Sequence, residues 1–496
     1  MATAADAARE FATGPQVAEA ARQLLSCFPL PELCEALANA RPEDAGHLFS
    51  AIERLAQFED AREAFLGDNV VSFLRQGAES QSPQIRTLVA KLVARLVKEG
   101  GEVATSRLAS HGLLEACEVL LMDEETGTAE AAVGTFCVVV QFPTWREAAL
   151  GAVERLQGRL GDMLDVQRIR VLHLFVELGR ASDDVFASLE RRGAYRQVLG
   201  AFLTEDILLK LNAVELMEAL GSFPAGQDLL SREGLPQQLA QELLDPMCDD
   251  SVRLCVVRLL GLILRRTPAT MDTLLPGREA PLAQNIAGML ESTNPAERLC
   301  ALNAWADLSQ HPAGLAFFLQ WEGRLQAILA HVASTQNEVC KGAMASWAAV
   351  LQVPPPTASG AQGAQQLSEA PEILLWQIAE NRLLPLVLEN LTAKPFADVR
   401  CHVWQLLALL VQSRSAAQVA VPSEHLRELL LDFTSETDCS ARIAKHAFVQ
   451  SLQRHDQWLN AFLDENVVQL LAEFAQQGPH WVPCNAAAMV GDQAGA

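Results

Sequence analysis

A repeat of about 42 residues runs through most of this 496-residue chain. Each copy consists of a short polar turn, a basic side chain and then an apolar run with helical spacing that ends in small residues. One copy extends from Ser82 to Val97 and another from Asp165 to Gly179. A unit of this length cannot bury its own apolar face, so neighbouring units must stack on one another around a shared core.

The basic side chains define the period. They are Arg86, Arg170, Lys210, Arg253, Arg298, Lys341, Arg400 and Arg442. Successive members are 84, 40, 43, 45, 43, 59 and 42 residues apart, and the first step spans two periods with a degenerate copy near Thr126 to Val140. All steps but one therefore fit the same unit, and the chain has room for about ten repeats.

The one long step coincides with a change in composition. Residues 353–371 contain three consecutive prolines, at 354–356, followed by a stretch rich in Gly, Ser and Gln. Such a sequence cannot continue a helix. It predicts a surface loop inserted between two parts of the array, residues 1–352 and 372–477, with a tail at 478–496. A tolerated insertion is favoured over a partner-binding loop.

A second recurring segment, about 20 residues before most of the cations, places a glycine in front of a new amphipathic run. These glycines are Gly67, Gly112, Gly193, Gly234 and Gly323. Glycine accepts the left-handed or sharp-turn backbone that ends one helix before the next begins. Each unit then holds three helices, as in armadillo repeats, whereas HEAT units of similar length hold two. We predict an all-α superhelix, an α-solenoid of armadillo or HEAT type.

Charge and cysteine usage limit the class of protein. The chain has 61 acidic and 38 basic residues and a net charge of -23, which argues against nucleic acid and against anionic membranes as partners. No stretch reaches the roughly 18 uninterrupted apolar residues of a membrane span. The eleven cysteines are scattered without Cys-x-x-Cys spacing. We therefore expect reduced thiols and a cytoplasmic protein, with the nucleus as a second compartment.

The sequence holds no recognisable catalytic or cofactor motif. Phosphate-binding loops, nucleophile elbows and zinc-protease motifs do not occur. Cys439, His446 and His455 lie near one another in sequence, but the spacing of the two histidines fits no ligand pair on one helix. Carboxylate pairs such as Asp183 and Asp184 precede predicted helices, where they cap the helix N-terminus. We predict no enzyme, no cofactor, no metal and no small-molecule substrate.

The candidate binding site is the surface of the last helix in each unit, which in armadillo arrays lines a concave wall. We predict that a protein partner contacts Lys210, Asn212, Glu215, Arg253, Arg258, Arg298, Asn303 and Lys341, with Asp307, Arg400 and Gln405 as further members of the set. A row of cations inside an acidic protein would suit a helical partner with acidic and apolar groups. For any single cation, capping a turn is the simpler interpretation.

Several stretches resemble one family, that of the 26S proteasome non-ATPase regulatory subunit 5. The similar stretches are Val166–Val171, Leu203–Lys210, Gly226–Leu235, Phe396–His402 and the Gly-Pro-His-Trp-Val-Pro ending at Gly478–Pro483. Their order and spacing agree along nearly the whole chain, although the first sixty residues align poorly and His480 replaces an aromatic residue of the family. The 353–371 segment has no counterpart that we can place.

The resemblance implies a scaffold without catalysis. Members of this family hold the C-terminal domain of one proteasomal ATPase subunit, help its neighbours to join a precursor of the regulatory-particle base, and leave before the mature particle forms. The family offers no short motif for that contact. The alternative is a general armadillo adaptor, of nuclear-import or heat-shock-chaperone co-factor type. Asn303 and Trp305 would form one rung of an import-type ladder, which the other repeats lack.

Overall fold

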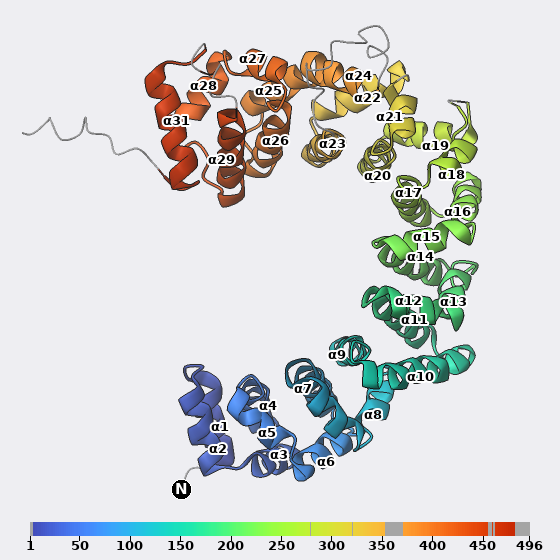
Figure 1. Cartoon of the computed structure of the whole chain (residues 1–496), viewed down its shortest axis with the longest axis vertical. Helices are drawn as coiled ribbons and strands as arrows, with labels where there is room; N and C mark the ends of the chain where they lie inside the picture. Colours follow the sequence, from blue (N-terminus) through green and yellow to red (C-terminus); the bar gives the residue numbers. More distant parts are fainter. Residues whose placement is uncertain are drawn as a thin grey trace, which may run out of the picture. The chain divides into compact units, whose positions relative to one another are not determined.

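A computed structural model describes residues 3–277, 279–319, 321–352, 371–454 and 462–481, together with Leu459. All regular elements in these ranges are helices, so the all-α prediction is confirmed (Figure 1). Two compact units, Met1–Gly226 and Gln227–Ala496, divide the chain inside the predicted N-terminal part of the array. The predicted insertion, apart from Pro371, and residues 482–496 of the predicted tail lie outside the described residues.

The first unit is a chain of short helices. In order they are α1 (Ala4–Thr13), α2 (Ala18–Cys27), α3 (Leu30–Ala38), α4 (Pro42–Leu55), α5 (Glu59–Phe65), α6 (Asp68–Gly77), α7 (Pro83–Ala109), α8 (Leu113–Leu120), α9 (Thr126–Val139), α10 (Pro143–Arg159), the 3-10 turn η1 (Leu160–Asp162), α11 (Asp165–Arg180), α12 (Asp183–Arg191), α13 (Ala194–Gly200) and α14 (Ile207–Gly221). The next helix, α15 (Pro224–Arg232), crosses the boundary between the units.

The second unit continues the same pattern. Its helices are α16 (Leu235–Leu244), α17 (Asp250–Leu264), α18 (Pro268–Leu274), α19 (Pro281–Leu290), α20 (Pro295–Leu308), α21 (Pro312–Leu319), α22 (Glu322–Val332), α23 (Asn337–Val350), α24 (Pro371–Ile378), the π-helical turn η3 (Ala379–Leu383), α25 (Leu384–Ala393), α26 (Ala397–Leu410), α27 (Arg414–Ala420), α28 (Glu424–Leu431), α29 (Cys439–Gln453) and α31 (Glu465–Gln477).

The last helix of each repeat packs against the last helix of the next. In the first unit this row consists of α4, α7, α9, α11 and α14, and in the second of α17, α20, α23, α26 and α29. We refer to the surface of each row as the third-helix face of its unit. Ten such helices within the described ranges agree with the predicted number of repeats, and their direct stacking is what a solenoid requires.

The glycine corners form at three of the five predicted places. Gly112, Gly193 and Gly234 have φ of 72°, 76° and 72° and cap the N-termini of α8, α13 and α16. Gly67 caps α6 with an extended backbone, and Gly323 lies inside α22, so its corner is displaced to the preceding residues. A further corner at Gly101, with φ of 63°, divides α7 into two segments.

Two repeats depart from the three-helix pattern. The residues of α24, η3 and α25 form one uninterrupted helical run before α26. The single long helix α10 and the short turn η1 stand before α11, where most repeats have two separate helices. None of the glycines within α10 adopts a positive φ, so the chain has no corner there. This repeat has the two-helix form of a HEAT unit, and the array combines both types.

Leucine, valine and alanine form most of the buried core, and large side chains fill the remaining space. The largest fully buried side chains are Trp305, Trp347, Trp376 and Trp404, all in the second unit. No helix in the described ranges is both long and apolar enough to span a membrane. The ten cysteines that the structure describes are free thiols.

Candidate partner-binding site

Six of the eight cations that define the period stand at one fixed place, four residues after the residue that caps each third helix. From there, arginine side chains turn back to carbonyl groups that end the preceding helix or turn. Arg86 Nη1 donates to the Ser80 carbonyl (2.9 Å), Arg400 Nη1 to that of Leu391 (3.2 Å) and Arg442 Nη2 to that of Glu436 (2.9 Å). The last carbonyls of a helix lack partners within it and favour a cation. These side chains therefore hold each turn closed.

The same guanidinium groups also reach the following repeat. Arg86 Nη2 donates to Asp123 Oδ1 (3.2 Å) and Arg400 Nε donates to Glu436 Oε2 (3.0 Å). Burial acts to raise the pKa of each of these carboxyl groups, but hydrogen bonds, above all from the arginine, outweigh it, so both pKa values lie below their usual range. Arg442 contacts His480 Nδ1 (3.0 Å) beyond its own repeat. Each such arginine thus links neighbouring repeats.

Two of the residues used to define the period, Arg170 and Lys341, do not occupy the fixed position. In α11 the position holds Arg168, whose Nε donates to the Leu160 carbonyl (3.3 Å), whereas Arg170 donates to the Glu124 carbonyl (3.2 Å). In α23 the position holds Cys340, whose Sγ donates to the Val332 carbonyl (3.0 Å). Lys341 follows one residue later. The cations still revealed the period of the repeat, because Arg170 and Lys341 lie only two residues and one residue after the fixed position.

Four of the eight predicted binding residues lie at or beside this position. Arg253 Nη1 pairs with Asp250 (3.0 Å) while its Nη2 donates to the Cys248 carbonyl (3.3 Å), and Arg298 contacts Gln336 of the next turn. Lys341 pairs with Glu338 and Asp398, each at 2.7 Å. Lys210 lies 5.5 Å from the centre of the Phe202 ring. Hydrogen bonds to turn carbonyls favour the turn-capping interpretation for Arg253 and Arg298, whereas Lys341 is held by two carboxylates.

A different position faces solvent in the middle of each third helix, nine residues after the capping residue. We refer to it as the mid-helix row, and its members are Ser50, Lys91, Gly134, His173 and Glu215 in the first unit and Arg258, Asn303, Ala345, Gln405 and Ala447 in the second. All are exposed except the half-buried His173. Three predicted residues, Glu215, Arg258 and Asn303, belong to this row. Asn212 instead donates to the Leu208 carbonyl of its own helix (2.7 Å).

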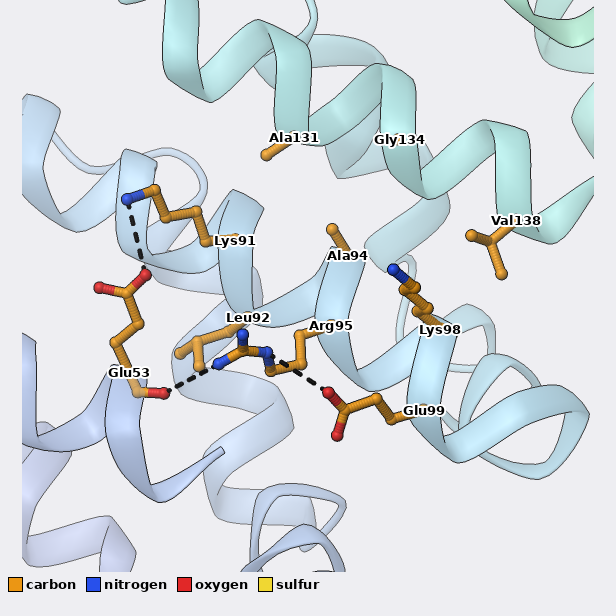
Figure 2. A pocket seen from close by; sticks show the side chains of 10 residues that line it. All are labelled: Glu53, Lys91, Leu92, Ala94, Arg95, Lys98, Glu99, Ala131, Gly134 and Val138. Carbon is orange, nitrogen blue, oxygen red and sulfur yellow. Dashed lines mark hydrogen bonds and ion pairs between the residues drawn. The ribbon is translucent and has the colours of Figure 1, made fainter. Parts of the chain in front are cut away.

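The first unit also has a groove on its third-helix face that the predicted set does not include. It lies between α4, α7 and α9, with a volume of about 450 Å³ (Figure 2). Lys91 Nζ is 3.5 Å from Glu53 Oε1 and Arg95 Nε is 3.6 Å from Glu99 Oε1. Lys98 has no hydrogen bond or ion pair within the described part of the chain. The groove therefore has a charged wall on α7, with one cation available to a ligand.

The opposite wall of this groove is small and apolar. It consists of Ala131, Gly134 and Val138 on α9, and a Cβ placed on Gly134 would meet no atom within 4 Å. This wall permits close approach of another helix. The predicted binding residues all lie at or after Lys210, so they include no residue of this groove.

A second, more apolar groove of about 810 Å³ opens between α3, α4 and α7. Leu37, Phe49 and Ile85 line it together with small residues. Lys91 connects the two grooves, because its Nζ lies 5.9 Å from the centre of the Phe49 ring. Together they could accept a segment that carries aliphatic side chains for the apolar groove and carboxylates for the cations of α7.

The residues considered for metal binding are not brought together. His446 Nε2 lies 3.2 Å from the Ala475 carbonyl, and Cys439 is exposed at the start of α29. His455 lies outside the described residues. Within the described ranges no group of three or more His, Cys, Asp or Glu side chains is arranged to hold a metal ion.

Comparison with known proteins gives one family over nearly the whole chain. The family model described as "Proteasome non-ATPase 26S subunit" matches residues 37–494. Proteins named 26S proteasome non-ATPase regulatory subunit 5 are 22% identical in Bos taurus and 21% identical in Homo sapiens, each alignment covering 93% of both chains.

Among solved structures, an engineered protein aligns at a TM-score of 0.42 and 16% identity, covering 85% of this chain and 98% of its own. A designed armadillo repeat protein in complex with the peptide (KR)4 aligns at 0.32 and 17% identity, covering 43% of this chain and 89% of its own. The extent of the family match, rather than these structural likenesses, settles the assignment: the chain belongs to the family of proteasome non-ATPase 26S subunits.

Proposed function

We propose that this chain is a non-catalytic scaffold that assists assembly of the regulatory-particle base of the 26S proteasome. It would hold the C-terminal domain of one proteasomal ATPase subunit and leave before the mature particle forms, in the cytoplasm and in the nucleus. The observation that carries the proposal is the family match over residues 37–494, supported by relatives of nearly equal length that are named as a proteasome regulatory subunit.

The fold supports a role in binding a folded partner. A stable protein interface covers about 800 Å² on each side, and each third-helix face is a continuous row of five stacked helices. The mid-helix row supplies outward polar side chains in several repeats, among them Lys91, Arg258 and Asn303. The two grooves of the first unit add an apolar pocket next to cations. We infer a partner surface that combines carboxylates with aliphatic side chains.

The proposed mechanism needs only binding and release. While the scaffold covers the ATPase domain, it sterically blocks docking of that domain onto the core particle. Contacts made as other subunits join would then compete with the scaffold for the domain. A bound partner leaves when the competing contacts have the greater free energy, so no catalytic step is required.

Co-purification tests this function in the cell. The tagged chain is isolated from its own cells at moderate salt, and the proteins that accompany it are identified by mass spectrometry. We expect proteasomal ATPase subunits without subunits of the core particle. Recovery of import cargo, or of a heat-shock chaperone, in place of the ATPases would contradict the proposal while leaving the fold intact.

A further inference from the structure

An exposed group of large aliphatic side chains lies at the N-terminal ends of α11 and α14. Its five members are between 49% and 72% exposed, and they are Leu164, Val166, Leu203, Ile207 and Leu208. We refer to them as the aliphatic edge. The other large aliphatic side chains exposed in the described part of the first unit, Val17, Val103 and Val119, are far from one another in sequence. Grouped exposure of this kind is typical of interaction sites.

The two halves of the edge belong to one surface. α11 and α14 pack side by side in the first unit. A depression of about 360 Å³ lies between them, lined by Leu160, Gly161 and Arg168 from one turn and by Ala201, Thr204 and Leu209 from the other. Leu164 and Leu203 lie within the chain segments that form these two walls. The edge thus combines exposed aliphatic groups with a depression beside them.

The turns that carry the edge are well formed. Asp206 caps α14, since its Oδ1 accepts from the Leu209 N–H (2.8 Å). The Leu164 N–H donates to Gln167 Oε1 (3.3 Å), and Arg168 closes its turn through the Leu160 carbonyl. Backbone groups at both helix starts are therefore satisfied, so the aliphatic side chains are held outward by ordered turns and not by a frayed segment.

Carboxylates surround the edge. Asp162, Asp165, Glu205 and Asp206 are exposed on the same two turns. Arg168 Nη1 pairs with one of these carboxylates, Asp165 (3.1 Å), and Lys210 lies over the Phe202 ring, so the four carboxylates outnumber the two cations beside them. The surface is therefore apolar in its centre and negative at its rim.

We propose that the aliphatic edge binds an amphipathic helix of another protein that carries leucine, isoleucine or valine on one face and lysine or arginine beside it. Burial of the aliphatic side chains would supply affinity, and the carboxylates at the rim would select a basic segment. A second copy of the chain fits poorly, because a symmetric contact would bring two acidic rims together in a protein with a net charge of -23. Anionic lipid and nucleic acid are repelled for the same reason.

This inference goes beyond the proposed function. It concerns the N-terminal ends of two helices, whereas the scaffold function was assigned to the mid-helix row and to the grooves of α4, α7 and α9. The chemistry is also opposite, because those grooves offer cations to an acidic partner. The two sites can be tested separately.

The test uses a fluorescein-labelled peptide of leucine and lysine, sixteen residues long, that forms an amphipathic helix. Its fluorescence anisotropy is measured against the full chain at physiological salt. We expect the double variant Leu203→Ser/Leu208→Ser to weaken binding about tenfold or more. The matched control Val103→Ser/Val119→Ser removes two exposed aliphatic side chains elsewhere in the same unit and should bind like the wild type.

A second variant keeps the test valid if the first fails to fold. Asp162→Lys/Glu205→Lys reverses two exposed carboxylates of the rim and should also weaken binding of the peptide. A photoreactive group on the peptide should crosslink to residues 160–168 and 200–209. Equal loss of affinity in the control, equal binding of a peptide with serine in place of leucine, or crosslinks confined to other segments would overturn the proposal.

Discussion

Two contacts between third helices of the second unit are made by different kinds of side chain: one contact lies in its middle repeats and the other in its last two repeats. Between α20 and α23, Trp305 and Trp347 meet edge to face, with ring centres 5.0 Å apart. Between α26 and α29, Arg400 and Trp404 converge on Glu436, which is 3% exposed, and Lys445 of α29 is buried nearby at 1% exposure. One contact is aromatic, and the other is a buried network of charges.

The difference lies in how the polar atoms are satisfied. Trp404 Nε1 donates to Glu436 Oε1 (2.8 Å), and Lys445 Nζ donates to the Asp432 carbonyl (2.7 Å) and to Ser435 Oγ (3.0 Å). Among the described residues, the indole N–H groups of Trp305 and Trp347 have no hydrogen-bond partner. An interface between repeats can therefore contain either a hydrogen-bonded network of charges or an aromatic pair whose N–H groups lack partners. The charged one should respond to mutation of a single partner and to pH, and the aromatic one should not.

The largest expected effect comes from Glu436→Gln, which leaves the Arg400 guanidinium, whose side chain is only 13% exposed, without its counter-ion. We expect the free energy of opening α26 and α29, measured by hydrogen exchange, to fall by about 3–5 kcal/mol. The matched control is Asp250→Asn, which breaks the pair with Arg253 where the aspartate side chain is 77% exposed. That change should cost less than about 1 kcal/mol. Equal effects of both variants would show that the network contributes no more than a surface pair.

The pH dependence of stability should show an effect of intermediate size. Burial lowers the pKa of Lys445 to about 8, below its value in the unfolded chain. Between these two pKa values the unfolded state binds more protons, so the contribution of Lys445 to stability rises with pH above about 8, by about 2 kcal/mol.

Buried thiols act in the opposite direction and require a control. Burial raises the pKa of Cys117 to about 12, so its contribution to stability is present below the unfolded thiol pKa and is lost as pH rises above that value. The variant Lys445→Met retains this thiol. The difference between wild type and variant, followed by urea unfolding from pH 7 to pH 10, isolates the lysine. A difference in stability between the two proteins that does not change with pH would contradict the lowered pKa of Lys445.

The smallest expected effect is the difference in destabilisation between two Trp→Phe variants. Trp404→Phe leaves Glu436 with one donor fewer and also removes volume, whereas Trp347→Phe removes volume and an N–H group without a partner. We expect Trp404→Phe to be more destabilising by about 1 kcal/mol, since a buried acceptor loses a hydrogen bond. Thermal unfolding of both single variants measures this. The reverse order would imply that the indole of Trp347 has a partner of its own.

The repeat fold could be predicted because its signals are local. The period, the polar turns and three glycine corners are each visible within one unit, and they sufficed for the all-α solenoid and its number of repeats. The outward-facing residues of the third helices were harder to predict. The prediction followed the basic side chains, whereas the structure places these residues at fixed distances from the capping residue of each helix. That choice selected Arg170 in place of Arg168 and overlooked Cys340, a thiol that serves as a donor to a carbonyl.

Other features depend on contacts that no local pattern contains. Glu436 follows Arg400 by 36 residues, and Lys445 reads as an ordinary surface lysine of an amphipathic helix until its neighbours enclose it. Leu208 belongs to an apolar run that looks like core, yet its place in the first turn of α14 directs it to solvent. The groove between α4, α7 and α9 depends on the packing of three helices from successive repeats, which no single repeat reveals.

The central claim is that the mid-helix row binds a proteasomal ATPase. Titration calorimetry with purified C-terminal domains of the base ATPases tests it, using the wild type and Lys91→Glu/Arg258→Glu. The control Arg196→Glu/Arg266→Glu makes the same charge change at exposed arginines outside the row. The account predicts that one domain binds the wild type and the control alike and binds the row variant about tenfold or more weakly. Failure of every domain to bind, or equal affinity for the row variant, would contradict it.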